Sequence, residues 1–510
     1  MRQKLAVKSS AIGLGAKLLA MVLSIISTRL FVHYLGIEIR GLSGVLSNIL
    51  SLLKLAEMGI GTAIIYALYQ PIVDKKIEEI KSLMCFYKKA YRGIGILVLG
   101  IGCIVSFFLK FFVEDTTYSW VYIYIIFFFQ LFESVSTYML GAYKRNLLYA
   151  DQKQYISTLI DALANTIFVI LRMVVIVFTR SYLLYLLLQL LQTVISNIVI
   201  GSVVDHKYPY LQDKDVTPYD KMPELLGNVK NVIAGRIGGV VYNSTDNIII
   251  SKTAGVVAVG YMTNYFMVRN LIKTITSAVT EPIRPMIGNY IREYRDIKKS
   301  YQLFLSYTFV RYCMANVVVV GVVVLINPFI ELWLGKGYTL SIWIPILLAL
   351  DMYIDLVHSP TWEYINVLGL FKNDRNMSYI GAAINLIVSI ILSIHMGVQG
   401  VLLGTVIAQM YYWIARTYVI YKEYFKIGVM HYMVINLVYA TVTVLDIGIV
   451  MCIYQYVLQE VSITRFLLMC FVSVSVSIVS ICILWGRTEE FKMIISILGK
   501  IRRYKENNKM

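Results

Sequence analysis

Residues 155–203 read YISTLIDALANTIFVILRMVVIVFTRSYLLYLLLQLLQTVISNIVIGSV. They contain two apolar runs, residues 155–179 and 181–203, which are separated by Arg180 alone. An α-helix needs about 20 predominantly apolar residues to cross the hydrocarbon core of a bilayer, and each run meets that length. The stretch therefore predicts two membrane-spanning helices joined by a tight turn.

The same pattern recurs along the rest of the chain. Of its 510 residues 58% are hydrophobic and only 15% are charged, whereas soluble domains carry about a quarter charged residues. The sequence therefore predicts an all-α integral membrane protein with about 14 transmembrane helices. The other predicted spans are 11–34, 42–69, 91–111, 118–142, 228–251, 257–283, 301–326, 339–366, 377–396, 399–421, 432–457 and 464–485.

The basic residues support this topology because they gather in alternate loops. Cytoplasmic loops of membrane proteins carry an excess of lysine and arginine. The loops on the opposite side contain only Arg40, Lys110, Arg180, Lys252, Lys336 and Arg465. The pattern places both termini in the cytoplasm. It also explains the net charge of +17 without a nucleic-acid partner.

Short motifs recur in the two halves of the chain. Leu35-Gly36 followed by Gly41 recurs as Ala254-Gly255 followed by Gly260, and Leu140-Gly141 recurs as Leu368-Gly369. Together with the equal helix counts, these motifs predict two homologous six-helix bundles in parallel orientation, as in many secondary transporters.

This repeat sets the predicted domain boundaries. An N-terminal bundle is followed by a cytoplasmic linker, a C-terminal bundle, two additional spans and a basic cytoplasmic tail. The boundaries are 1–203, 204–227, 228–426, 427–486 and 487–510.

Several segments carry a family resemblance, among them residues 29–36 (RLFVHYLG), 41–50 (GLSGVLSNIL), 55–64 (LAEMGIGTAI) and 397–405 (GVQGVLLGT). They resemble Wzx-type polysaccharide flippases of the MATE-like (MOP) exporter superfamily. The resemblance implies two six-helix bundles in a V around a central cavity, located in the bacterial cytoplasmic (inner) membrane. It implies that undecaprenyl-pyrophosphate-linked oligosaccharide crosses to the outer leaflet for capsule, exopolysaccharide or O-antigen assembly. Membrane lipid, a polysaccharide polymerase and other assembly proteins are the implied partners.

Catalytic chemistry has no support in the sequence. No metalloprotease, P-loop or hydrolase motif lies in a suitable context, and the five histidines lack the spacing of metal ligands. We therefore expect no catalytic residue, no metal site, no cofactor and no enzyme.

Charged residues inside predicted spans are the candidate functional groups, since each costs about 2.5–3.5 kcal/mol at a helix centre. A pyrophosphate would attract basic side chains in such a setting. The candidates for that contact are Arg29, Lys54, Arg236, Arg269 and Lys273. Arg269 and Lys273 are four residues apart and share one helical face.

Each candidate also has a structural interpretation. Lys54 and Glu57 are three residues apart and would pair with each other, whereas Lys17 and Arg311 lie near predicted cytoplasmic ends and favour snorkelling to the interface. Membrane carboxylates either pair with such cations or couple transport to a proton or sodium gradient. The candidates for that role are Glu57, Asp246, Glu281 and Asp351.

Three alternatives to a polysaccharide flippase stay open. A lipid II flippase of the same superfamily would show the same helices and a cationic cavity. A MATE-type drug exporter would favour acids in the first span, whereas the first span here has Lys17, Arg29 and no acid. A membrane polymerase or glycosyltransferase would favour a large outward loop, and every predicted outward loop is short.

Overall fold

The computed structural model describes residues 2–53, 60–212, 238–239, 244–281, 283–294, 296–457 and 461–492. All regular secondary structure in these ranges is helical. The chain divides into two compact units, Met1–Thr263 and Asn264–Met510. The predicted all-α fold is confirmed.

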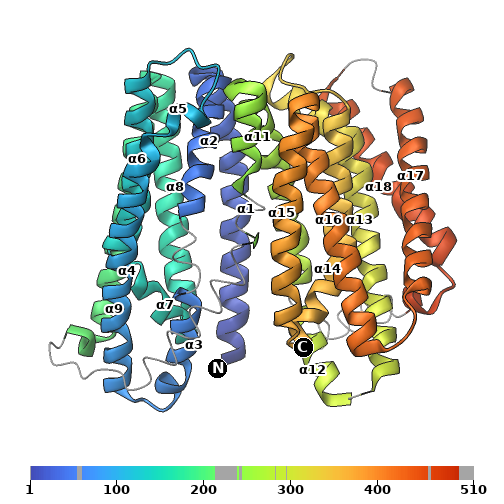
Figure 1. Cartoon of the computed structure of the whole chain (residues 1–510), viewed down its shortest axis with the longest axis horizontal. Helices are drawn as coiled ribbons and strands as arrows, with labels where there is room; N and C mark the ends of the chain where they lie inside the picture. Colours follow the sequence, from blue (N-terminus) through green and yellow to red (C-terminus); the bar gives the residue numbers. More distant parts are fainter. Residues whose placement is uncertain are drawn as a thin grey trace. The chain divides into compact units, whose positions relative to one another are not determined.

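The first unit consists of long helices that run along one another (Figure 1). Within it α1 packs against α8, α6 packs against α4 and α9, and α2 also contacts α6. The bounds are α1 (Arg2–Leu35), α2 (Ile37–Leu53), α3 (Ile60–Val73), α4 (Ile77–Ser106), α5 (Leu109–Phe112), α6 (Trp120–Met139), α7 (Tyr143–Ala150), α8 (Gln154–Thr179), α9 (Tyr182–Lys207) and η2 (Pro209–Gln212).

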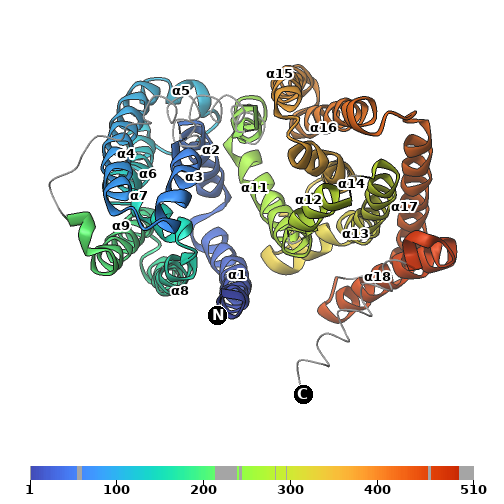
Figure 2. The ribbon, with the colours of Figure 1, turned by 90° about the horizontal axis from the view of Figure 1, so that it is seen from below.

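The second unit is built around α13 and α14, which pack against each other (Figure 2). α14 also contacts α16, α16 packs along α15, and α17 and α18 both contact α13. The bounds are α11 (Asp246–Thr280), which begins in the first unit, α12 (Ile283–Tyr294), α13 (Ile297–Leu334), α14 (Trp343–Leu368), α15 (Phe371–Met396), α16 (Val398–Ile420), η3 (Tyr421–Phe425), α17 (Met430–Val457) and α18 (Ile463–Trp485).

Ten helices in the described ranges are long and apolar enough to cross a membrane. They overlap ten of the predicted spans, and the largest difference is at α4, which begins at Ile77 whereas the predicted span begins at residue 91. The other four predicted spans lie partly outside the described residues or carry several charges, as in α11 and α14. The total of fourteen stays a prediction.

The glycines of the repeated motifs adopt matching backbone conformations. Gly36 has φ +87° and Gly255 has φ +81°, while Gly141 has φ +88° and Gly369 has φ +73°. Glycine enters this left-handed region without steric cost. The two halves therefore bend at corresponding places, which supports the predicted repeat.

A third repeated glycine pair brings α2 against the first part of α11. A β-carbon on Gly41 would lie 1.9 Å from the carbonyl oxygen of Val256, and one on Gly260 would lie 2.2 Å from the carbonyl oxygen of Ile37. The two backbones can meet this closely only because neither residue has a side chain. The glycines that the two repeated motifs share thus lie where α2 and α11 come closest.

Candidate functional site

One face of α14 carries a row of titratable side chains. Asp351, Asp355 and His358 follow one another at intervals of four and three residues, so they project from the same side of the helix, and Glu363 lies five residues after His358. A rise of 1.5 Å per residue spreads this row over about 18 Å, more than half of a hydrocarbon core of about 30 Å.

A matching row of cations extends from α11 into α12. The guanidinium of Arg269 lies 2.5 Å from the Asp351 carboxylate, and the ammonium of Lys273 lies 2.9 Å from that of Asp355. Further along, Arg284 lies 3.9 Å from Glu363. We call these three cation–carboxylate pairs the charge ladder. All of them lie within the second unit.

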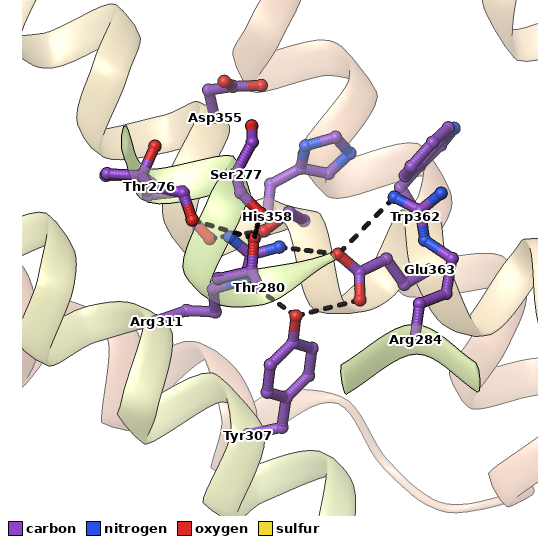
Figure 3. Close-up of polar contacts among 12 residues, drawn as sticks. Thr276, Ser277, Thr280, Arg284, Tyr307, Arg311, Asp355, His358, Trp362 and Glu363 are labelled. Carbon is purple, nitrogen blue, oxygen red and sulfur yellow. Dashed lines mark hydrogen bonds and ion pairs between the residues drawn. The ribbon is translucent and has the colours of Figure 1, made fainter. Parts of the chain in front are cut away.

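Glu363 is the most densely bonded acid of the charge ladder (Figure 3). Arg311 of α13 donates to it at 2.6 Å, and the hydroxyl of Tyr307 donates to it at 2.9 Å. The Nε of Arg311 in turn donates to the Tyr307 hydroxyl at 3.0 Å. Arg311 is only 5% exposed, so the snorkelling interpretation of this residue was wrong.

His358 links the ladder to the next two helices. Its Nε2 lies 3.1 Å from Nη1 of Arg416 on α16, and the Nε of Arg416 donates to Asp374 of α15 at 2.7 Å. No role was predicted for His358 because the histidines are scattered along the chain. Its place in the i, i+4, i+7 row on α14 was the available signal.

Exposure separates the cations of this network into two kinds. The side chain of Arg269 is 15% exposed, whereas those of Lys273 and Arg284 are 49% and 42% exposed. The guanidinium of Arg284 also lies over the ring of Trp362, 4.8 Å from its centroid. Lys273 and Arg284 can therefore reach an incoming anion while a carboxylate holds each of them in place.

Arg284 is a residue that sequence reasoning missed as a site candidate. It lies just beyond the predicted span 257–283 and was assigned to the cytoplasmic loop. Helical spacing does not connect it to Lys273, because α11 ends at Thr280 and α12 begins at Ile283. Between these two cations α11 presents the hydroxyl side chains labelled in Figure 3, Thr276, Ser277 and Thr280.

The other predicted site residues lie elsewhere. Arg29 is exposed on α1, Asp246 is buried at the start of α11, and both belong to the first unit. Glu281 is exposed after the end of α11. Lys54, Glu57 and Arg236 lie outside the described residues. Of the nine predicted residues, the structure brings together Arg269, Lys273 and Asp351.

The first unit contains a polar cavity of about 310 Å³. Arg145 forms an ion pair with Asp161 there and donates to the side-chain oxygen of Asn197 at 3.0 Å. Most of the remaining lining groups are neutral amides and hydroxyls, which suit hydrogen bonding to a polyhydroxyl compound. The cavity is lined by Tyr91, Thr137, Ala142, Arg145, Asn146, Asp161, Gln192, Thr193, Ser196 and Asn197.

Comparison with known proteins gives the family. A family profile described as "Polysaccharide biosynthesis protein" matches residues 6–291, more than half of the chain. No curated protein sequence matches the chain.

Solved structures share the fold at low sequence identity. The lipid II flippase MurJ in an inward closed conformation has a TM-score of 0.69 and 15% identity, with 93% of this chain and 99% of that chain covered. A multidrug resistance MATE family transporter of the MOP superfamily has a TM-score of 0.55 and 13% identity, with 80% and 96% covered. A MOP superfamily transporter from Pyrococcus furiosus has a TM-score of 0.52 and 15% identity, with 81% and 94% covered.

The family and the fold are those of multi-pass membrane transporters. The earlier resemblance is confirmed by the family profile and by the fold of the neighbours. The chain belongs to the polysaccharide biosynthesis protein family of Wzx-type flippases, and it shares the fold of a MATE family transporter of the MOP superfamily.

Proposed function

We propose that the protein is a flippase for undecaprenyl-pyrophosphate-linked oligosaccharide and has no catalytic activity. It would move repeat units across the cytoplasmic membrane by alternating access, with both of its termini in the cytoplasm. The observation that carries this proposal is the charge ladder, whose two exposed cations, Lys273 and Arg284, lie beside carboxylates.

The ladder suits a pyrophosphate for an electrostatic reason. Arginine and lysine bind phosphate oxygens strongly where water is excluded, and arginine offers paired donors. Before substrate binds, Asp355 and Glu363 neutralise Lys273 and Arg284 and so reduce the cost of holding cations in the membrane. An arriving pyrophosphate would replace these carboxylates as the partner of the exposed cations.

The neutral part of the substrate needs different chemistry. The cavity of about 310 Å³ in the first unit presents amide and hydroxyl groups, which can exchange hydrogen bonds with sugar hydroxyls. We include this cavity in the proposal as a contact for the oligosaccharide. Delivery to a polymerase and other assembly proteins, and coupling to a proton or sodium gradient, also belong to the proposal.

The two other transporter functions fit less well. A lipid II flippase would use the same ladder because its substrate also carries a polyprenyl pyrophosphate, and the family match favours the polysaccharide branch. A drug exporter for cationic compounds would favour exposed carboxylates, whereas the most exposed members of the ladder are Lys273 and Arg284.

The test is performed in cells that lack the gene. We expect loss of surface polysaccharide and accumulation of lipid-linked repeat units in the inner leaflet, measured by lipid extraction and mass spectrometry. The wild-type gene and the control Lys298→Ala, an exposed cation at the start of α13, should restore the polymer. Lys273→Ala and Arg284→Ala should restore it poorly. Normal surface polymer in the deletion strain, together with new sensitivity to cationic drugs, would contradict the proposal.

A further inference from the structure

One buried carboxylate of the second unit has no basic partner among the described residues. Asp446 lies near the middle of α17 and is 2% exposed. The buried acids of the charge ladder pair with arginine or lysine, and Asp374 pairs with Arg416. Asp446 forms no ion pair in the described part of the chain, so none of the described residues compensates its charge.

Neutral polar groups from three helices surround Asp446. Its Oδ2 accepts hydrogen bonds from the amide of Asn316 on α13 at 2.9 Å and from the hydroxyl of Ser480 on α18 at 2.7 Å. Thr443, one turn earlier on α17, lies 3.4 Å from the same amide. Asn316 is 0% exposed and Thr443 is 3% exposed.

The side-chain oxygen of Asn316 accepts no hydrogen bond from the described residues. The amide nitrogen of Asn316 lies within hydrogen-bond distance of three oxygens, those of Asp446, Thr443 and Tyr312, although an amide nitrogen carries two protons. The Oδ1 of Asn316 is buried and has no hydrogen-bond partner among the residues that the structure describes. Rotation of the amide by a half turn would point this oxygen toward the oxygens of Asp446, Thr443 and Tyr312. A positive charge placed among these oxygens would interact favourably with each of them.

The energetics require such a charge. An ionised carboxylate buried without a counter-charge costs several kcal/mol even after the protein relaxes, and neutral hydrogen bonds offset only part of this cost. A proton or a small hard cation removes the penalty, and hard cations prefer the carboxylate, amide and hydroxyl oxygens found here.

We propose that Asp446, Asn316, Thr443 and Ser480 form a site for a neutralising monovalent cation, Na⁺ or a proton, between α13, α17 and α18. The site is separate from the charge ladder, and the proposal does not depend on what the protein transports. Among the described residues, the other titratable groups nearby are the hydroxyls of Tyr312, Tyr353 and Tyr439, the thiols of Cys313 and Cys482, and the carboxylate of Glu490, which acts on Tyr439. The bound cation would hold α17 and α18 against α13, the helix that also carries Arg311.

The experiment measures the thermal unfolding midpoint of the purified full-length protein. One series replaces choline chloride with NaCl at constant pH and ionic strength, and a second lowers the pH in choline chloride alone. A ligand that binds only the folded state raises the midpoint by mass action. We expect the wild-type midpoint to rise by a few degrees with Na⁺ if sodium is the ligand, or to rise as pH falls if the ligand is a proton.

Asp446→Asn keeps the size and polarity of the side chain and removes its charge, so this variant should lose the response. The matched control is Asp205→Asn, the same change at a carboxylate that pairs with Lys144 in the first unit, and it should keep the response. If Asp446→Asn fails to fold, Ser480→Ala should weaken the apparent cation affinity severalfold. The proposal is overturned if Asp446→Asn follows the wild type in both series, or if Ser480→Ala leaves the affinity unchanged.

Discussion

The predicted repeat aligns α6 with α14, and the two helices differ in chemistry. The offset of 228 residues that relates Gly141 to Gly369 aligns the titratable row of α14 with α6. Asp351, Asp355, His358 and Glu363 correspond in this way to Ile123, Phe127, Gln130 and Val135. Ile123 and Phe127 are fully buried apolar side chains. α6 therefore contributes apolar side chains to the core of the first unit, whereas the aligned helix α14 carries a row of titratable side chains in the second.

The partner helices differ in the same way. The offset of 219 that relates Gly36 to Gly255 aligns Arg269 of α11 with Leu50 of α2. Leu50 is buried, and α2 packs against α6. Leu50 and Ile123 of the first unit thus align with the ion-paired Arg269 and Asp351 of the second. The repeat supplies a common scaffold, and the second unit alone uses this position for charge.

The largest expected effect comes from replacing the Arg269–Asp351 ion pair with the apolar residues found at the aligned positions of the first unit. Asp351→Ile alone should destabilise the protein by about 3–5 kcal/mol because it removes the carboxylate that lies 2.5 Å from the largely buried Arg269. Adding Arg269→Leu should recover most of that loss, since apolar residues often replace a buried ion pair without cost. Thermal unfolding of both variants measures the difference. A double variant no more stable than Asp351→Ile would show that the two positions are not equivalent.

The second effect tests the contact between the repeats. Gly260→Ala should cost about 1–3 kcal/mol because the added methyl group overlaps the backbone of α2. Gly41→Ala should behave in the same way because its methyl group would meet the backbone of α11. The control is Gly100→Ala in α4, where a β-carbon meets nothing within 4 Å. Equal unfolding midpoints for the Gly260 and Gly100 variants would contradict the close approach.

The third effect separates stability from transport within the ladder. Lys273→Ala should change the unfolding free energy by only about 0–1 kcal/mol because its ion pair with Asp355 is half-exposed. Arg311→Ala should destabilise strongly because Glu363 would remain buried. Unfolding and polymer assembly would be measured on the same two variants. A large loss of stability in Lys273→Ala would make this lysine a structural residue.

The smallest effect concerns the chain near Gly36 and near Gly255. The segment just before α6 contacts these two places through different interactions. Glu114 pairs with Lys252 near Gly255, whereas Glu38 near Gly36 accepts hydrogen bonds from Thr117 and Thr116. Burial tends to raise the pKa of Glu38, but these hydrogen bonds outweigh it and lower that pKa below its usual value.

Because its pKa is lowered in the folded state, ionised Glu38 stabilises the fold at neutral pH. This stabilisation is lost as the pH falls below about 4. We expect Glu38→Gln to be about 1 kcal/mol less stable than wild type at neutral pH. This difference should shrink as the pH falls through the pKa of folded Glu38. A difference that stays constant with pH would contradict this account.

Much of the fold follows from the sequence, because span length and the placement of basic residues depend on local composition. The pairing of Arg269 and Lys273 on one face was predicted from their spacing. Their partners were not, because periodicity gives the face of a helix but not the neighbour that packs on it. Arg311 was misjudged because α13 begins at Ile297, which places Arg311 about four turns inside the helix. Arg284 was missed because it lies beyond the end of α11, in α12, and was counted among the basic residues of a cytoplasmic loop.

The central claim, that the exposed cations of the charge ladder bind a pyrophosphate, can be tested by direct binding. The measurement is the affinity of the purified protein for a short-chain polyprenyl pyrophosphate, with the matching alcohol as the ligand control. We expect Lys273→Ala and Arg284→Ala each to weaken binding of the pyrophosphate by about tenfold or more, equivalent to about 1.4 kcal/mol. Lys298→Ala should bind it like the wild type. Unchanged affinity in both ladder variants would contradict the assignment of this site.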